Sequence, residues 1–350
     1  MKKQRLNILL IGPVTNVKAN LIGGATISFG YLEDYLRKIG QPFVLVNTQH
    51  WLGGIKQKLN PLYILMKVMM NIWRIDVIFL NSSRGGTRLL APPLYWLSRL
   101  LSKKFVFRPF GGDIKDYTAP YSKRQKWIFE HTVLKADILF LQTKELMRFY
   151  ADQRANTIQL PTSRNAPATS LLRGQRPFQK KFLFLGYVNQ PKGIDHILEA
   201  AEQLGEGYQL HIYGPLVQDK YKTQFQSSHP NYKGVLKKEE VLSVLRSYDV
   251  LLLPTFYEGE GYPGSIIEAY SLGLPVISTQ WKAIPEIVQH QHTGLLITPR
   301  STEALAEAIR HFDTSNYPAY SKQARQYFLE SFSADAVNAK ALDAIQNLYL

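Results

Sequence analysis

Two glutamates with seven residues between them follow a buried run, where their carboxylates could hold the hydroxyl groups of a ligand. The segment LLLPTFYEGEGYPGSIIEAYSLG (251–273) reads as an apolar strand, a glycine-rich loop containing Glu260, and a helix containing Glu268. Gly261 and Gly264 allow the loop to turn its backbone amides inward. A carboxylate inside an otherwise apolar helix is costly to bury without a partner. The pattern therefore favours a ligand role over a solvated face. In such a role Glu260 can accept hydrogen bonds from sugar hydroxyls, and Glu268 can take both hydroxyls of a ribose.

A lysine and a pair of glycines follow two other expected strands. In FLFLGYVNQPKGIDHIL (182–198), Lys192 opens a helix just after the polar loop of a strand, where an ammonium group can neutralise a diphosphate. Gly23 and Gly24 precede a helix after the first apolar run, and adjacent glycines let backbone amides approach a phosphate. The alternative for Lys192 is an ordinary solvated lysine in the first turn of a helix, and the alternative for the glycine pair is a flexible turn; both would give the same sequence pattern. The glycine pair is also not a G-x-G-x-x-G dinucleotide fingerprint.

Strands and helices alternate along the chain, which predicts parallel sheets covered on both faces. The alternation is interrupted between 160 and 181 by a stretch rich in Pro, Ser, Arg and Gly, and then restarts. We therefore expect two doubly wound α/β domains with a cleft between them, and ligands beyond the carboxyl ends of the strands. The expected parts are a first domain over 1–165, a linker over 166–180, a second domain over 181–330 and a C-terminal helix over 331–350.

The positive charge of the chain is concentrated in its first half. The net charge is +15; residues 1–165 hold 25 Lys and Arg against 9 Asp and Glu, whereas residues 166–350 hold 17 against 18. Such a field attracts polyanions, including anionic membranes and phosphate-bearing substrates, although a basic face that only aids solubility is the alternative. Cysteine is absent, which excludes disulfides and thiolate zinc sites. The first apolar run is shorter than a secretory signal, so we expect a cytoplasmic protein.

Several segments of the second half together resemble the retaining glycosyltransferases of family four, which have the GT-B fold of two facing Rossmann-like domains. The resemblance covers about 180–300 and is specific in order and spacing. It rests on FLFLGYVNQPKGIDHILEA, LHIYG, KGVLKKEEVLSVLRSYDVLLLPT, EGYPGSIIEAYSLGLPVIST and IPEIVQHQHTGLLI. The first half matches more loosely, through GGATISFGYLEDYLRKIG. In this family the C-terminal helical region crosses back onto the first domain.

The resemblance implies roles for individual residues. Lys192 would bind the donor diphosphate and act in catalysis with Glu260, which holds the transferred sugar, while Glu268 holds the ribose. The implied donor-binding set is Gly23, Gly24, Tyr187, Lys192, Gly234, Val235, Leu236, Thr255, Glu260, Gly261, Tyr262, Pro263, Gly264 and Glu268.

Two positions depart from the family pattern. Tyr187 stands where the family usually has an arginine that assists the lysine, so diphosphate stabilisation falls more heavily on Lys192. The first domain has RPFGGD where the family often has a histidine near the reaction centre. Arg108 or Asp113 is then expected to line the acceptor side, with Asp113 as a third catalytic candidate.

The expected activity is transfer of a sugar, with retention of configuration, from a nucleotide-diphosphate sugar to a glycan or lipid-linked acceptor in cell-surface polysaccharide synthesis. No Asp-x-Asp metal signature is present, and we expect neither metal nor cofactor. Basic, apolar stretches at 55–74 and 92–105 suggest peripheral contact with an anionic membrane, or else core-facing helices. The competing functions are a nucleotide-sugar epimerase of the same fold and a nucleic-acid-binding protein. The latter is not expected, because no RNA-binding or zinc-finger signature occurs.

Overall fold

The computed structural model describes residues 5–14, 24–49, 60–110, 114–153, 155–172, 177–225 and 229–350. The chain forms two compact units. The first unit contains residues 1–163 together with 334–350, and the second contains residues 164–333. The segment expected as a linker, 166–180, thus falls within the second unit.

The first unit contains a parallel sheet of six strands. Their order is β2-β1-β3-β4-β5-β6, so the order reverses between β1 and β3. The short, continuously apolar runs of the sequence become the inner strands β1, β3, β4 and β5, which are buried as parallel strands are, whereas the edge strands β2 and β6 are mostly half-buried. The strands are β1 (Ile8–Gly12), β2 (Phe43–Asn47), β3 (Val77–Ser82), β4 (Lys104–Pro109), β5 (Ile138–Leu141) and β6 (Thr157–Gln159).

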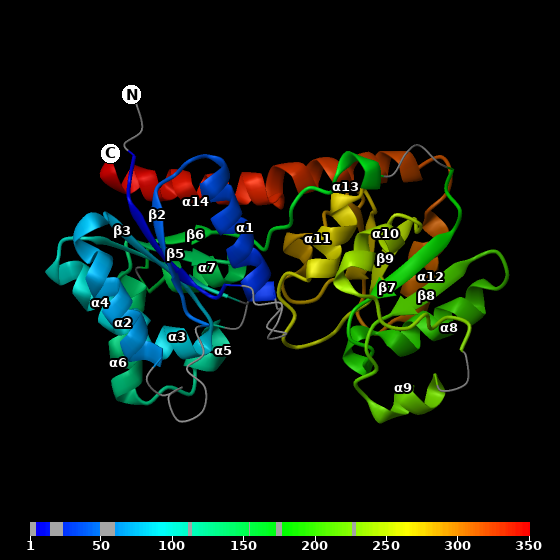
Figure 1. Ribbon diagram of the computed structural model, residues 1–350. Coiled ribbons are helices and arrows are strands. Elements are labelled where there is room, and N and C mark those ends of the chain that lie inside the picture. The colour runs from blue at the N-terminus through cyan, green and yellow to red at the C-terminus, as the bar shows by residue number, and fades with distance from the viewer. Residues whose placement is uncertain are drawn as a thin grey trace. The chain divides into compact units, whose positions relative to one another are not determined.

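Helices cover both faces of this sheet (Figure 1). Successive strand residues point to opposite faces, and Phe79 and Leu80 of β3 accordingly belong to two different core clusters. One cluster is completed by α1 (Gly24–Lys38) and α14 (Ala334–Gln346). The other is completed mainly by α2 (Asn60–Asn71), α4 (Ala91–Leu100), α6 (Lys123–His131) and α7 (Lys144–Ala151). The shorter helices are α3 (Arg84–Leu89) and α5 (Ile114–Thr118), with 3₁₀ turns η2 (Ile72–Arg74) and η3 (Val133–Lys135).

The end of the chain returns to the first unit. Helix α14 packs on α1, where Asn338 Nδ2 donates to the carbonyl of Tyr31 at 3.1 Å and Lys38 pairs with Asp335 at 2.8 Å. The closing turn η8 (Asn347–Tyr349) brings the Tyr349 hydroxyl to the carbonyl of Asp76, at 2.9 Å. The C-terminal segment is therefore part of the core of this unit.

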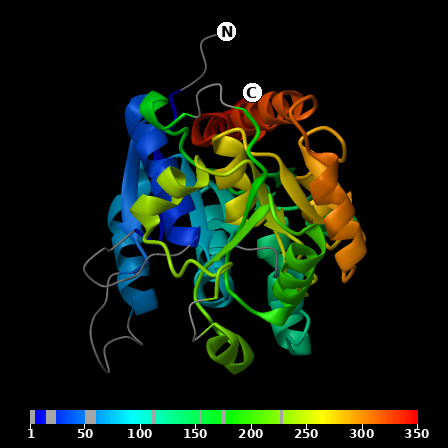
Figure 2. The same ribbon diagram turned by 90° about the vertical axis from the view of Figure 1, so that its right-hand side faces the viewer.

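The second unit contains a five-stranded parallel sheet with the order β11-β10-β9-β7-β8. Here the order reverses between β7 and β9. Helix α8 packs with α12, and α11 packs with α13, so the strands lie between helical layers (Figure 2). The strands are β7 (Lys181–Leu185), β8 (Gln209–Tyr213), β9 (Val250–Leu253), β10 (Val276–Thr279) and β11 (Gly294–Ile297). The helices are α8 (Ile194–Leu204), α9 (Asp219–Gln224), α10 (Val241–Leu245), α11 (Gly264–Ser271), α12 (Thr302–His311) and α13 (Tyr317–Ser331), with 3₁₀ turns η4 (Thr169–Leu171), η5 (Gln190–Lys192), η6 (Lys238–Glu240) and η7 (Ile284–Glu286).

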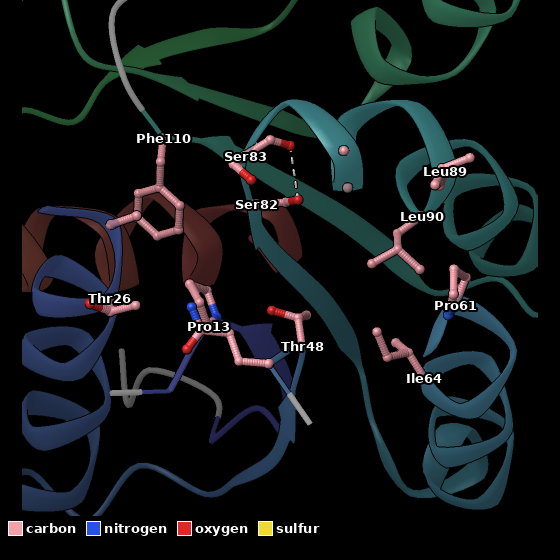
Figure 3. Close-up of a pocket in the computed structure, with 14 residues that line it drawn as sticks. Pro13, Thr26, Thr48, Pro61, Ile64, Ser82, Ser83, Leu89, Leu90 and Phe110 are labelled. Atoms are coloured by element: carbon pink, nitrogen blue, oxygen red, sulfur yellow. Dashed lines mark hydrogen bonds between the residues drawn. The ribbon is translucent and has the colours of Figure 1, made fainter. Parts of the chain in front are cut away.

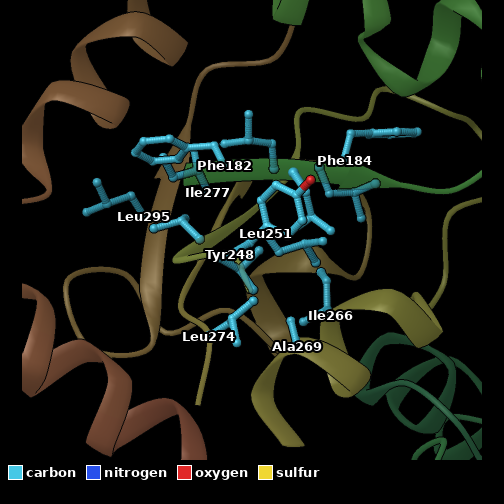
Figure 4. Close-up of a cluster of buried hydrophobic side chains, with 14 of the residues drawn as sticks. Phe182, Phe184, Tyr248, Leu251, Ile266, Ala269, Leu274, Ile277 and Leu295 are labelled. Carbon is cyan, nitrogen blue, oxygen red and sulfur yellow. The ribbon is translucent and has the colours of Figure 1, made fainter. Parts of the chain in front are cut away.

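A single apolar core holds the second unit together (Figure 4). Phe182, Leu251 and Ile277 come from three neighbouring strands, and Ile266 and Ala269 pack onto them from α11. All five side chains are fully buried. Two doubly wound α/β domains were predicted, and the two parallel sheets confirm that prediction. Within the described parts of the chain, no helix is both long enough and apolar enough to cross a membrane.

Candidate active site

The predicted donor-binding residues of the second unit gather where its strand order reverses. The end of β7 leads through η5 to Lys192, and the end of β9 leads through Thr255 to Glu260. Since β7 and β9 are neighbours in the sheet, the two loops meet at its carboxyl edge. This is the position at which open α/β sheets bind their ligands.

Glycines allow these loops to approach the strands closely. Gly193 has a φ of +79°, and a Cβ there would overlap the carbonyl oxygen of Pro254. Gly214, at φ +144°, would overlap the carbonyl oxygen of Gly186 in the same way. Only glycine fits both the left-handed conformation and the contact. The lysine-bearing turn is therefore pressed against the end of β9, where Phe256 N also donates to the carbonyl of Pro191 at 2.7 Å.

Lys192 and Glu260 form a largely buried ion pair. The Lys192 Nζ lies 2.5 Å from Glu260 Oε2, with side chains 15% and 7% exposed. The Thr255 hydroxyl donates to the same carboxylate oxygen at 2.7 Å, and the ammonium lies 5.1 Å from the centre of the Tyr257 ring. A charge-assisted contact of this kind fixes both groups in place. The sequence predicted that these three polar residues serve one site, and the structure brings them together.

Glu268 is held by an arginine that the sequence did not single out. Arg164 Nε donates to Glu268 Oε1 at 2.8 Å, and the side chains are 12% and 25% exposed. The guanidinium also lies against the first residue of α11, because a Cβ on Gly264 would overlap Arg164 Nη2. Arg164 comes from the segment beside the expected linker, where no motif marked it. Its role depends on a contact made 104 positions away along the chain.

In the loop between the two glutamates the large side chain points into the protein, and the expected contact of the loop backbone with a ligand stays a prediction. Tyr262 is buried, and its hydroxyl donates to Glu286 Oε2 at 2.7 Å. Pro263 is the extended residue that precedes α11, and Gly264 is the first residue of that helix. Gly261 lies in the same loop, between Glu260 and Tyr262.

The remaining predicted donor residues of this unit lie around the ends of β7 and β8. Tyr187 lies two residues after the end of β7 and is 62% exposed. Gly234, at φ +90°, accepts a hydrogen bond from Gly214 N at 2.9 Å through its carbonyl, which ties its loop to the end of β8. Val235 is 61% exposed and Leu236 is partly buried. Their binding roles stay predictions.

The predicted residues of the first domain are only partly described. Gly24 is the first residue of α1, whereas Gly23 and Asp113 lie outside the described residues. Arg108 is buried in β4, where Nη2 donates to the carbonyl of Pro161 at 3.3 Å and Nη1 has no hydrogen-bond partner within the described structure. Burial lowers the pKa of the Arg108 guanidinium to about 10.

The first unit also contains a pocket that no motif indicated. It has a volume of about 290 Å³ (Figure 3). It lies at the carboxyl ends of the strands, next to the point where the strand order reverses between β1 and β3. Thr48, Ser82 and Ser83 give it hydroxyl groups. Part of the lining is apolar, including four residues from the start of α2 and the junction of α3 and α4: Pro61, Ile64, Leu89 and Leu90.

Comparisons with known proteins agree with this architecture. Residues 179–313 match the family described as glycosyl transferases group 1. The crystal structure of HepE from Anabaena in complex with UDP and glucose is similar over 98% of this chain and 100% of that chain, with a TM-score of 0.69 and 15% identity. The chain has the GT-B fold. Lys192, Glu260 and Glu268 all lie within the residues that match this family.

Two curated relatives are similar in sequence to part of this GT-B chain. The putative colanic acid biosynthesis glycosyltransferase WcaL of Escherichia coli is 28% identical over 206 residues, covering 54% of this chain and 48% of that protein. The putative teichuronic acid biosynthesis glycosyltransferase TuaC of Bacillus subtilis is 32% identical over 136 residues, covering 39% of this chain and 33% of that protein. The chain thus spans less than half the length of each.

Proposed function

We propose that this protein is a retaining glycosyltransferase that moves a sugar from a nucleotide-diphosphate sugar to a glycan acceptor in the synthesis of a surface polysaccharide. The observation that carries the proposal is the Lys192–Glu260 pair at the point where the second sheet reverses its strand order. The family match over 179–313 and the names of the two bacterial relatives support the same reaction and pathway class.

The geometry provides what this reaction needs from the protein. When the bond between the anomeric carbon and the diphosphate breaks, the leaving nucleotide takes the electron pair and its phosphate gains negative charge. Lys192, held in place by Glu260 and close to the tight Gly193 turn, would stabilise that charge as it develops. The acceptor hydroxyl oxygen then bonds to the same face of the anomeric carbon, and its proton passes to the departing phosphate. No enzyme nucleophile is required.

The two glutamates have distinct roles in this proposal. Donor binding would compete for the carboxylate of Glu260, since sugar hydroxyls and the Lys192 ammonium are alternative partners for the same oxygens. Glu268 would accept the ribose hydroxyls while Arg164 holds its carboxylate in orientation. The pocket of the first unit, which combines hydroxyl groups with an apolar wall, is proposed to receive part of the acceptor.

A thermal-shift screen of the full chain tests the donor class. UDP-glucose, UDP-galactose, UDP-N-acetylglucosamine and GDP-mannose are suitable probes, with the uridine compounds first because HepE was solved with UDP and glucose. A sugar nucleotide that binds only the folded state raises the melting temperature. If none of the four changes it at millimolar concentration, the proposed donor class is wrong.

Lys192→Ala then tests the catalytic role. Losing one preorganised charge-stabilising group should reduce turnover about 10²–10³-fold. Lys220→Ala is the matched control, because Lys220 is an exposed lysine of the same unit that pairs with Asp195 at 2.9 Å. Radiolabel transferred from the donor to product measures both variants. Near-normal turnover in the folded Lys192→Ala protein would remove Lys192 from the mechanism.

A further inference from the structure

Helix α2 and the turn η2 that follows it carry apolar side chains on two faces, but only one face is covered by the first unit. Ile64, Val68 and Ile72 repeat every four residues and are buried in the core. A second set repeats at i, i+4, i+7, i+8 and i+11, which places its members on one side of a helix. This outer stripe consists of Leu62, Met66, Met69, Met70 and Trp73, whose exposed fractions are 66%, 50%, 47%, 67% and 75%.

The outer stripe is unusual for the solvent-facing side of a helix, which is normally charged or polar. Lys67 is the one charged residue of α2. Helix α4 packs into the same core cluster, so it covers the same face of the sheet, and it exposes 48% of Trp96 and 80% of Leu100. Contiguous apolar patches on a protein surface mark sites of interaction.

The stripe lies within the most basic part of the chain. Residues 35–112 contain twelve Lys and Arg and a single acid, Asp76. That segment therefore contributes +11 of the net charge of +15. The Asp76 carboxylate accepts a hydrogen bond from Asn7 N at 2.7 Å, so the one acid of the segment is engaged with the start of the first sheet. Lys67 and Arg74 lie among the stripe residues in the sequence.

We propose that the outer stripe docks on the surface of an anionic phospholipid bilayer. Leucine, methionine and tryptophan side chains would enter the boundary between head groups and acyl chains, and the surrounding basic residues would meet lipid phosphates. At twelve residues, α2 is about 18 Å long and lies in the plane of the interface instead of crossing it.

Charge decides between the bilayer and a second copy of this chain. Helix α2 and turn η2 carry Lys67 and Arg74 and no acid, so a pair joined through the outer stripe would bring like charges together, which opposes such contact. An anionic bilayer complements the same field. Exposed tryptophan is also favoured at membrane interfaces, where its ring is amphipathic.

Docking has a consequence for the pocket of the first unit. Pro61 and Ile64 of α2 line that pocket beside Leu89, which is 57% exposed (Figure 3). A docked α2 would hold the apolar side of the pocket near the head-group layer, which suits an acceptor glycan carried on a lipid. This corollary rests on the proposed function, whereas docking itself does not.

Co-sedimentation of the full chain with vesicles tests docking without using enzymatic activity. Vesicles of equal parts phosphatidylglycerol and phosphatidylcholine should bind the protein at low salt, and pure phosphatidylcholine vesicles should bind it at least about tenfold more weakly. Raising the salt concentration should weaken the binding as well. The double variant Leu62→Glu/Met70→Glu should partition about tenfold less. Leu329→Glu, a change at an exposed leucine of the second unit, should bind like the wild type.

Tryptophan fluorescence supplies an independent measurement. Anionic vesicles should shift the emission to the blue, and Trp73→Phe should reduce the shift while leaving sedimentation intact, because phenylalanine keeps the apolar contact. Melting temperatures of all variants check that they fold. Docking is refuted if the folded chain does not bind anionic vesicles, if Leu62→Glu/Met70→Glu binds as well as the wild type, or if the stripe mediates a dimer in solution.

Discussion

At the scale of single residues, each acid of the candidate site is neutralised by a base from elsewhere in the second unit. Lys192 neutralises Glu260, and Arg164 neutralises Glu268. Partly buried carboxylates need such partners, since an unpaired charge in a poorly hydrated site is costly. These two ion pairs therefore orient the acids of the candidate site.

Arg164→Gln should weaken donor binding more than it slows chemistry. The substitution removes the ion pair, so Glu268 loses the contact that orients its carboxylate, and we expect a cost of about 1–3 kcal/mol in unfolding free energy. If Glu268 binds the ribose equally in ground and transition states, the KM for the donor rises while kcat changes little. Steady-state kinetics and urea denaturation measure the two effects.

The design includes a conservative variant and a control for Arg164. Arg164→Lys should recover part of the KM, because a lysine keeps the charge but not the planar geometry. Arg246→Gln changes an arginine of the same unit whose Nη1 donates to the carbonyl of Ser170 at 3.2 Å, in an exposed contact. It should leave both the KM and the stability near their wild-type values. An unaltered donor KM in Arg164→Gln would show that Arg164 is not a positioning residue.

At the scale of elements, the site depends on how closely the η5 turn approaches the end of β9. Gly193→Ala should therefore destabilise the second unit by about 2–4 kcal/mol, because it adds a clash with the backbone of Pro254 to the cost of a positive φ. Gly207→Ala is the matched control: its φ is +100°, but a Cβ there meets nothing within 4 Å. It should cost only about 1–2 kcal/mol. Equal losses in chemical denaturation would contradict the close-approach argument.

The strand β8 introduces a pH dependence into the stability of the second unit. The pKa of His211 is lowered from its usual 6.5 to about 4. Burial of the ring is the main cause, and the nearby charges of Lys233 and Lys181 add to it. The ring is hydrogen-bonded to the Tyr248 hydroxyl at 2.7 Å. Because the folded-state pKa is depressed, the unfolded chain takes up the proton first. The stabilisation is complete above pH 6.5 and is lost as the pH falls from 6.5 towards 4.

His211→Gln should remove that part of the pH dependence. The wild type should lose about 1–2 kcal/mol over this interval from His211, less than the full value for such a shift because the ring is only partly buried and solvent screens it. The variant should lose correspondingly less between pH 6.5 and 4. Urea denaturation at several pH values measures both proteins. Parallel stability curves would show that His211 does not contribute.

At the scale of the whole molecule, the two parallel sheets could be predicted from the sequence. Most of their strands are short, continuously apolar runs that alternate with helices, a pattern typical of parallel strands covered on both faces. The sequence also predicted the meeting of Lys192 with Glu260, since both follow strand ends at one edge of a sheet. Contacts between distant segments left no local pattern. Arg164 reaches Glu268 across 104 positions, and the pocket of the first unit combines residues from six separate stretches of the chain that share no motif.

The stretches 55–74 and 92–105 illustrate the same difficulty. The sequence allowed either membrane contact or core-facing helices, because hydrophobicity alone does not say which face is covered. In α2 and η2, the buried Ile64, Val68 and Ile72 face the core, as the second interpretation requires, and the exposed outer stripe is available for membrane contact. Only the packing of the helix on the sheet separates the two sets.

A bound donor nucleotide should slow amide hydrogen exchange in only one of the two units. If the donor nucleotide is held at the β7–β9 edge, hydrogen exchange of the full chain with UDP should slow in the segments 186–193 and 255–268, and the strands of the first sheet should exchange as before. Binding stabilises whichever unit holds the ligand, by an amount that grows with the logarithm of its concentration. Mass spectrometry of peptides from both units measures the pattern, with AMP as a nucleotide control. Protection centred on the first unit would place the nucleotide on the wrong sheet and would overturn the assignment of Lys192, Glu260 and Glu268 to donor binding.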